Sequence, residues 1–92
     1  MSYQIDIGTA AQKEVKSLPG HVRAQARRLI RALSNEPRPA RAKELRGKSN
    51  LYRIWLAGHW RIVYQIKDDL QIVLIIRVCH KEEIDYGNVD AE

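Results

Sequence analysis

Apolar residues along the chain change from a helical to a strand-like spacing near residue 50. Ala11, Val15 and Leu18 recur every three or four residues, and a longer stripe of the same kind runs from residue 22 to residue 33. Alternating apolar and polar residues, which are typical of strands, occur in four segments: 3–7, 52–56, 60–66 and 70–78.

Breaking and capping residues mark the boundaries of the two helices. Thr9, with Gln12 three positions later, matches a capping box at the start of the first helix. Pro19 separates the two helices, and two prolines within 35–39 end the second. The segment 40–50 then reads as a loop with room for one helical turn.

The predicted order of elements is therefore β-α-α-β-β-β. Two tightly joined helices form an antiparallel hairpin, and consecutive strands joined by short turns form antiparallel pairs. We expect an α+β fold with a mainly antiparallel four-stranded sheet, covered on one face by the N-terminal helical hairpin. The 92 residues fit one domain spanning residues 1–92.

Each of the last three strands has one set of side chains that is wholly apolar or aromatic. We expect these sets to face the helices: Tyr52, Ile54, Leu56; Trp60, Ile62, Tyr64, Ile66; and Leu70, Ile72, Leu74, Ile76, Val78. Residues that lie opposite each other in a hairpin point to the same face of the sheet. If all three apolar sets face the helices, each of the two turns between these strands must therefore have three residues. This arrangement pairs Leu56 with Trp60, and Ile66 with Leu70.

The other face of the predicted sheet carries cations and an aromatic residue: Arg53, Trp55, Arg61 and Arg77. The formal net charge is +5, and the segment before this sheet adds Lys43, Arg46 and Lys48. Arginine binds phosphate and tryptophan stacks on bases, so this face is a candidate for RNA binding. The alternative is a solvated basic surface with one exposed tryptophan.

Composition excludes several other classes of protein and site. Cys79 is the only cysteine, which rules out an intramolecular disulfide and a Cys-rich zinc site and favours a reducing cytoplasm. The longest apolar run, 72–76, is too short to span a bilayer, and no signal peptide is expected. The chain has no glycine-rich phosphate loop and no HExxH motif, and we expect no cofactor.

Three stretches carry a resemblance to a known family: "ELRGKSNLYRI", "HWRIVYQIKDDLQIVLIIRV" and "HKEEIDY". Together they resemble the RelE/ParE superfamily of toxins from toxin–antitoxin pairs, and within it the RelE branch. The resemblance implies an endoribonuclease that cuts mRNA in the ribosomal A site, without a metal, through attack of the RNA 2′-OH. It also implies three partners: a cognate antitoxin, the ribosome and mRNA.

The family motif transfers onto particular residues of this chain. The basic residues of the resembling strands fall on Arg53 and Arg61, and the basic residue past the last strand falls on Lys81, with His80 beside it. The terminal tyrosine falls on Tyr86. Trp55 stands where RelE-branch members often have a second lysine, which leaves the family's proton-transfer scheme incomplete here.

The expected chemistry divides these residues by role. Arg53 and Arg61 suit neutralisation of the phosphorane but cannot act as bases. The base or acid must come from His80, Lys81, Tyr86 or His59, or from the ribosome and RNA. Two other functions stay open: a ParE-like toxin that inhibits DNA gyrase, and a catalytically weakened RNA-binding homologue.

Overall fold

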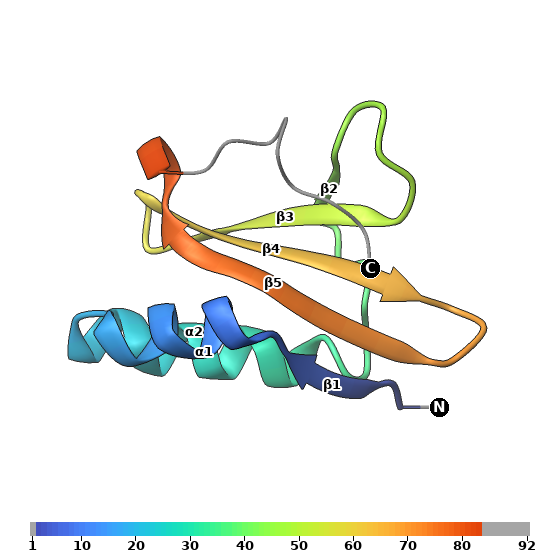
Figure 1. Cartoon of the computed structure of the whole chain (residues 1–92), viewed down its shortest axis with the longest axis horizontal. Helices are drawn as coiled ribbons and strands as arrows, with labels where there is room; N and C mark the ends of the chain where they lie inside the picture. Colours follow the sequence, from blue (N-terminus) through green and yellow to red (C-terminus); the bar gives the residue numbers. More distant parts are fainter. Residues whose placement is uncertain (1, 84–92) are drawn as a thin grey trace.

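The computed structural model describes residues 2–83, which form two helices packed on a five-stranded sheet (Figure 1). The elements in chain order are β1 (Gln4–Ile7), α1 (Thr9–Ser17), α2 (Gly20–Ala32), β2 (Lys43–Glu44), β3 (Leu51–Leu56), β4 (Trp60–Lys67), β5 (Ile72–His80) and the 3₁₀ turn η1 (Lys81–Glu83). The sheet order is β1-β5-β4-β3-β2, with β1 parallel to β5 and the other pairs antiparallel. The predicted α+β class is confirmed.

The sheet has one more strand than predicted. β2 lies in the segment that reads as a loop in the sequence, and it pairs Lys43 with Arg53 and Glu44 with Tyr52. A two-residue strand leaves too short an alternation to be recognised from the sequence. Its pairing holds the start of the loop 45–50 against the edge of β3.

Both helices cover the same face of the sheet, as predicted (Figure 1). Helix α2 contributes Val22, Ala26 and Ile30 to the main core, and α1 contributes Ala11 and Val15. The sheet side of this core consists of Ile54, Leu56, Ile62, Tyr64, Ile66, Val73, Ile75 and Val78. No helix within residues 2–83 has the length and apolar character needed to cross a membrane.

The start of α1 differs from the predicted capping box. The N-cap is Gly8, and its N–H donates to the carbonyl of Ile75 at 2.9 Å. A Cβ at this position would lie 3.1 Å from that same carbonyl oxygen, so the close approach to β5 favours glycine. The side chain of Gln12 donates to the Ile7 carbonyl at 2.7 Å instead of reaching back to Thr9.

The hairpin between β3 and β4 has the predicted register. Leu56 lies opposite Trp60, and the three-residue connection places Ala57 at φ 50° and Gly58 at φ 79°. These left-handed conformations are typical of three-residue hairpin loops. The predicted apolar sets of β3 and β4 therefore face the helices.

The hairpin between β4 and β5 differs from the prediction. Its connection has four residues, 68–71, and Ile66 lies opposite Val73 rather than Leu70. Adding one residue to a turn reverses the face of every side chain that follows. Val73 and Ile75 therefore face the helices, while Leu70 is 62% exposed.

A β-bulge restores the predicted facing at the end of β5. Val63 lies opposite Arg77 and Tyr64 lies opposite Ile75, so Ile76 is the extra residue between them. Beyond it, Val78 faces the helices as predicted. Ile76 instead packs against a small cluster on the opposite face, formed by Leu45, Leu51 and Val63.

Candidate nucleic-acid interface

A hollow of about 670 Å³ lies over the face of β3 and β4 that points away from the helices. Its lining residues come from the loop after β2, from β3, from β4 and from η1: Leu45, Arg46, Lys48, Arg53, Arg61, Lys81 and Glu82. Five of these seven are Lys or Arg, and we call this site the basic hollow. It brings together three of the predicted catalytic residues and two of the predicted RNA-binding residues.

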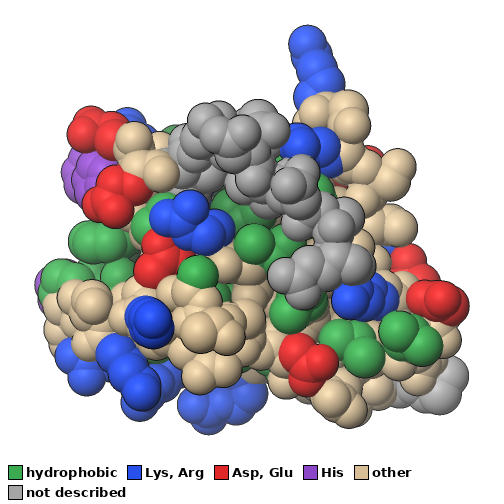
Figure 2. All heavy atoms as spheres, in the orientation of Figure 1, with side chains coloured by type: hydrophobic (Ala, Val, Ile, Leu, Met, Phe, Trp, Pro, Cys, Tyr) green, Lys and Arg blue, Asp and Glu red, His purple; other side chains and the backbone are tan. Residues whose placement is uncertain are grey.

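Positive charge alone does not single out this site. Figure 2 shows Lys and Arg side chains over the helical layer along the lower edge of the molecule, as well as over the loop between β2 and β3 near the top. The basic hollow differs from the helical surface because its cations come from four separate segments and converge on one concavity.

Strand alternation places Arg53 and Arg61 in the hollow. Arg53 lies opposite Val63, and Arg61 lies opposite Trp55, all on the face away from the main core. Lys43 lies opposite Arg53 on the adjacent strand and is exposed. It is a neighbour of the hollow but does not line it.

Arg61 is held more firmly than an exposed-face arginine would be. Its side chain is 5% exposed, and Nη1 donates to the carbonyls of Trp60 at 3.0 Å and Gly58 at 3.4 Å. The guanidinium carbon lies 3.6 Å from the centroid of the Trp55 ring. Trp55 itself is 46% exposed. The sequence indicated the face on which Arg61 lies but not that the indole would cover it.

Cys79 is the cross-strand neighbour of Arg61, because it lies opposite Arg61 on the adjacent strand β5. Burial, and after it the nearby Glu14 carboxylate, raise the pKa of its thiol to about 11. The thiol therefore stays protonated at neutral pH and acts as a packed apolar side chain.

The turn η1 brings Lys81 to the basic hollow. The Lys81 N–H donates to the carbonyl of His59 at 2.9 Å, which ties the end of β5 to the tip of the β3–β4 hairpin. Glu82 follows and lines the same hollow. The sequence reasoning did not assign Glu82 to the site. The only signal for it was its place directly after Lys81.

His80 points to the other side of the sheet. It lies opposite Trp60, its ring stacks on His59 with centroids 5.9 Å apart, and Trp60 meets it edge-on at 5.5 Å. Successive residues of a strand face opposite ways, so Cys79 lies on the Arg61 side and His80 does not. The structure thus separates His80 from the basic hollow.

Arg77 is paired with a residue of α1. Its Nε and Nη2 donate to the Glu14 carboxylate at 2.8–3.1 Å, and the Val78 N–H donates to the same carboxylate at 2.9 Å. This pairing holds Arg77 at the β5 edge rather than in the hollow.

The predicted catalytic residue Tyr86 lies outside the described residues.

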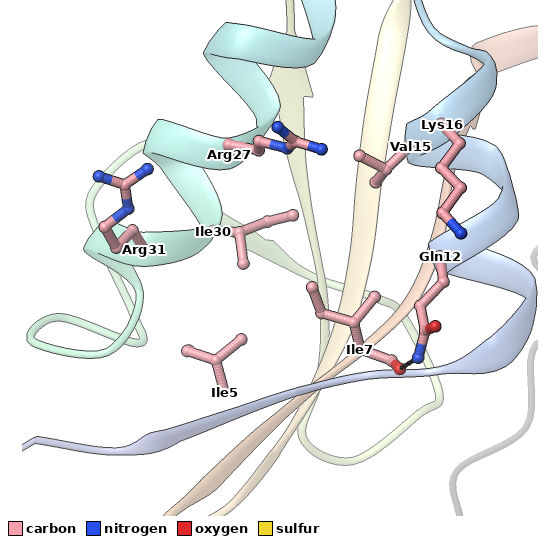
Figure 3. Close-up of a pocket in the computed structure, with 8 residues that line it drawn as sticks. All are labelled: Ile5, Ile7, Gln12, Val15, Lys16, Arg27, Ile30 and Arg31. Atoms are coloured by element: carbon pink, nitrogen blue, oxygen red, sulfur yellow. Dashed lines mark hydrogen bonds between the residues drawn. The ribbon is translucent and has the colours of Figure 1, made fainter.

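A second hollow, of about 420 Å³, lies between β1 and the two helices (Figure 3). The isoleucine and valine side chains form its apolar wall, and Lys16, Arg27 and Arg31 project from the helices around it. The amide of Gln12 is already bonded to the Ile7 carbonyl. The described residues that line it include no imidazole or carboxylate, so they offer fewer groups for acid–base chemistry than those of the basic hollow.

No group of three His, Cys, Asp or Glu side chains suited to holding a metal ion occurs within residues 2–83. The described residues that line the basic hollow carry guanidinium, ammonium and carboxylate groups. Guanidinium and ammonium groups bind and stabilise phosphates, and ammonium and carboxylate groups transfer protons.

Comparison with known proteins gives consistent matches over nearly the whole chain. Residues 5–85 match the family described as the ParE toxin of the type II toxin–antitoxin system parDE. The mRNA interferase toxin RelE of Escherichia coli K12 is 34% identical over 83 residues, which cover 89% of this chain and 86% of that protein.

Solved structures match to a similar extent. A chain of the intact E. coli RelBE toxin–antitoxin complex is 32% identical with a TM-score of 0.79, and the match covers 89% of this chain and all of that one. The isolated E. coli RelE toxin is 30% identical with a TM-score of 0.78, and the match covers 94% of this chain and 92% of that one.

Proposed function

The chain belongs to the RelE/ParE superfamily of toxins from type II toxin–antitoxin systems, and on this premise we propose that it is a ribosome-dependent endoribonuclease. In this proposal it cleaves mRNA in the ribosomal A site, needs no metal, and inhibits translation in the cytoplasm. The observation that carries the proposal is the basic hollow, where five cations line one concavity on the sheet face away from the helices. The relative named mRNA interferase supports the choice of RNA as substrate.

The proposed reaction is attack of a ribose 2′-OH on the adjacent phosphorus. A bond forms between O2′ and phosphorus, and the bond between phosphorus and O5′ breaks. The products are a 2′,3′-cyclic phosphate and a 5′-hydroxyl. The 2′-OH loses its proton to a base, and O5′ gains one from an acid.

The cations of the hollow suit the charge that develops on the phosphorane. Arg53 and Arg61 would bind its oxygens through guanidinium N–H groups, and they keep their protons throughout. The Lys81 ammonium is the proposed donor to the departing O5′. The proposed acceptors of the 2′-OH proton are Glu82, Tyr86 and groups of the ribosome or RNA. His80 lies on the other side of the sheet, so it is the weakest of the predicted acid–base candidates.

The direct test is cleavage of a defined mRNA by the purified protein on programmed ribosomes, mapped by primer extension. We expect cuts at fixed positions within A-site codons. Arg53→Ala and Arg61→Ala should each lower the cleavage rate about 100-fold or more, the usual effect of removing a donor to a developing oxyanion. Arg28→Ala, an exposed arginine on α2, is the matched control and should cut at the wild-type rate.

The outcomes separate the site from the function. If the wild type leaves mRNA intact on ribosomes, the endoribonuclease proposal is wrong. If the wild type cuts and both hollow variants cut equally well, the site is wrong. Because Arg61 is nearly buried, circular dichroism must show that its alanine variant is folded, and Arg61→Lys provides a milder second variant.

We also propose that a cognate antitoxin neutralises this toxin. The support is that matching chains were solved in complex with antitoxins, including the E. coli RelBE complex. Expression of the chain alone should arrest growth, and co-expression of the neighbouring antitoxin gene should relieve that arrest. Unchanged arrest on co-expression would contradict this partner.

The family match described as ParE supports one competing function, inhibition of DNA gyrase. That function predicts an SOS response on induction with no cuts in mRNA. A third function, RNA binding without cleavage, follows from Trp55, which stands where the resemblance to the RelE branch implies a second lysine. It predicts ribosome binding with neither cleavage nor toxicity, so the primer-extension experiment separates all three.

A further inference from the structure

We infer that Trp55, backed by Arg61, is a stacking platform for one nucleobase of the bound RNA and gives the toxin a purine preference at that position. This inference deepens the proposed function, because it takes RNA as the ligand of this face. It assigns the indole to recognition rather than to proton transfer, since an indole N–H only donates hydrogen bonds.

The geometry of the indole leaves one face available for a ligand. The Arg61 guanidinium lies over the ring, with its central carbon 3.6 Å from the ring centroid. Trp55 is nevertheless 46% exposed, one of two large apolar side chains in residues 2–83 with that much exposure. An indole covered on one side by a cation and open on the other is the arrangement that a base can extend into a three-layer stack.

The platform is held in place before any ligand binds. Arg61 is fixed by its bonds to the carbonyls of Gly58 and Trp60. The backbone of Trp55 is held as well, because Arg41 Nη2 donates to its carbonyl at 3.1 Å. A ring that is already immobilised loses little conformational entropy on stacking, which favours affinity.

The position of the platform also matches a nucleotide. Arg53, which lines the basic hollow, lies two residues from Trp55 on the same face of β3, or about 7 Å along the strand. A base on the indole therefore places its sugar and phosphate beside the cations of the hollow. Larger bases overlap the indole more fully, so purines should stack more strongly than pyrimidines.

Fluorescence of Trp55 reports on the stack directly. The chain contains two tryptophans, so the experiment uses a Trp60→Phe background in which Trp55 is the remaining reporter. The probe is a short purine-rich RNA with 2′-O-methyl groups, which cannot be cleaved because the attacking hydroxyl is blocked. We expect binding to quench the Trp55 emission, with tighter binding by purine than by pyrimidine oligonucleotides.

Substitutions and abasic probes then assign the contact. In the Trp60→Phe background Trp55→Leu should weaken binding about 5- to 100-fold, the range for loss of one base stack, while Trp55→Phe should retain most of the affinity. An abasic nucleotide at the stacked position should weaken binding to the Trp55 protein but not to the Trp55→Leu protein. Arg61→Lys should increase quenching of Trp55 by acrylamide, because an ammonium cannot cover the ring as a planar guanidinium does.

Each other outcome overturns the inference. The inference is wrong if Trp55 fluorescence is not quenched at millimolar oligonucleotide. It is also wrong if every abasic probe loses the same affinity for the Trp55 protein as for the Trp55→Leu protein. The readout does not depend on cleavage, because the probe is not a substrate. If RNA quenches Trp55 but mRNA is not cleaved, the stacking platform is supported and the endoribonuclease proposal is rejected. If mRNA is cleaved but Trp55 is not quenched, the endoribonuclease proposal is supported and the stacking platform is rejected.

Discussion

At the scale of single residues, Arg38 shows how one side chain can join distant parts of this chain. Its guanidinium donates to both oxygens of Asp68, at 2.7 and 3.1 Å, and its Nε donates to the Tyr52 hydroxyl at 2.9 Å. The Tyr3 hydroxyl also donates to Asp68, at 2.8 Å. Together these bonds link the start of the sheet, the loop after α2 and the β4–β5 turn.

The Asp68 carboxylate makes this linkage sensitive to acid. The hydrogen bonds from Arg38, and then from Tyr3, lower its pKa from 3.8 to about 2. A carboxyl with a lowered pKa in the folded state stabilises the fold at pH values above its unfolded pKa. That contribution decreases from about pH 4 and is lost as the pH falls through about 2.

Substitution of Asp68 tests this pH dependence. We expect Asp68→Asn to have a lower melting temperature than the wild type, by a constant amount above about pH 4. This difference in melting temperature should shrink between pH 4 and pH 2, because the Asp68 carboxylate of the wild type becomes protonated in that range and loses the charge that the asparagine already lacks. Asp69→Asn, at the neighbouring position in the same turn, is the control. A difference that is the same at pH 2 and pH 6 would contradict the linkage.

At the scale of elements, the contact between α1 and β5 depends on Glu14. Strand β1 pairs with β5 only as far as Ile75, and within residues 2–83 no strand pairs with the edge beyond it. Glu14 accepts from the Val78 N–H and from the Arg77 guanidinium at this edge. A helix side chain thus takes the place of a strand, and protects an edge that could otherwise pair with another chain.

Removal of this carboxylate should destabilise the protein. Its side chain is 20% exposed, and Glu14→Ala would leave both the Val78 N–H and Arg77 without this acceptor. We expect the free energy of unfolding to fall by about 1–3 kcal/mol, as for a partly buried group that loses its partner. Urea denaturation followed by circular dichroism measures it. Glu36→Ala, at an exposed position, is the control, and equal losses in the two variants would refute this role for Glu14.

At the scale of the whole molecule, the formal net charge of +5 makes binding of a polyanion depend on salt. Each phosphate neutralised by a protein cation releases counterions, which lowers affinity as salt rises. The stack on Trp55 contributes affinity without such a release. The salt concentration should therefore change the affinity contributed by the cations, and the identity of the base should change the affinity contributed by Trp55.

A salt titration separates these two contributions. For the uncleavable RNA, the logarithm of the affinity should fall linearly with the logarithm of the salt concentration. Arg53→Ala should reduce the slope by about 0.7, the value for one phosphate contact to a single strand. Trp55→Leu should weaken binding at every salt concentration and leave the slope unchanged. A slope that changes equally in both variants would mean that the two residues do not divide these roles.

The sequence alone predicted the part of this structure that depends on local periodicity. The two helices, the β3–β4 hairpin register and the facing of Arg53 and Arg61 each follow from spacing and from a short turn whose length was correctly inferred. The four-residue turn at 68–71 and the bulge at Ile76 were not predicted. A one-residue change in a turn alters no composition and no local pattern, yet it reverses the facing of the strand that follows.

The sequence by itself thus determined the order of the helices and of every strand except β2, the basic character of one face and the resemblance to a toxin family. Only the tertiary structure decided which cations meet. It joined Lys81 and Glu82 to Arg53 and Arg61, paired Arg77 with Glu14, and placed His80 on the other side of the sheet. The reason is physical: facing follows from the alternation within one strand, whereas partners depend on how segments distant in the chain pack together.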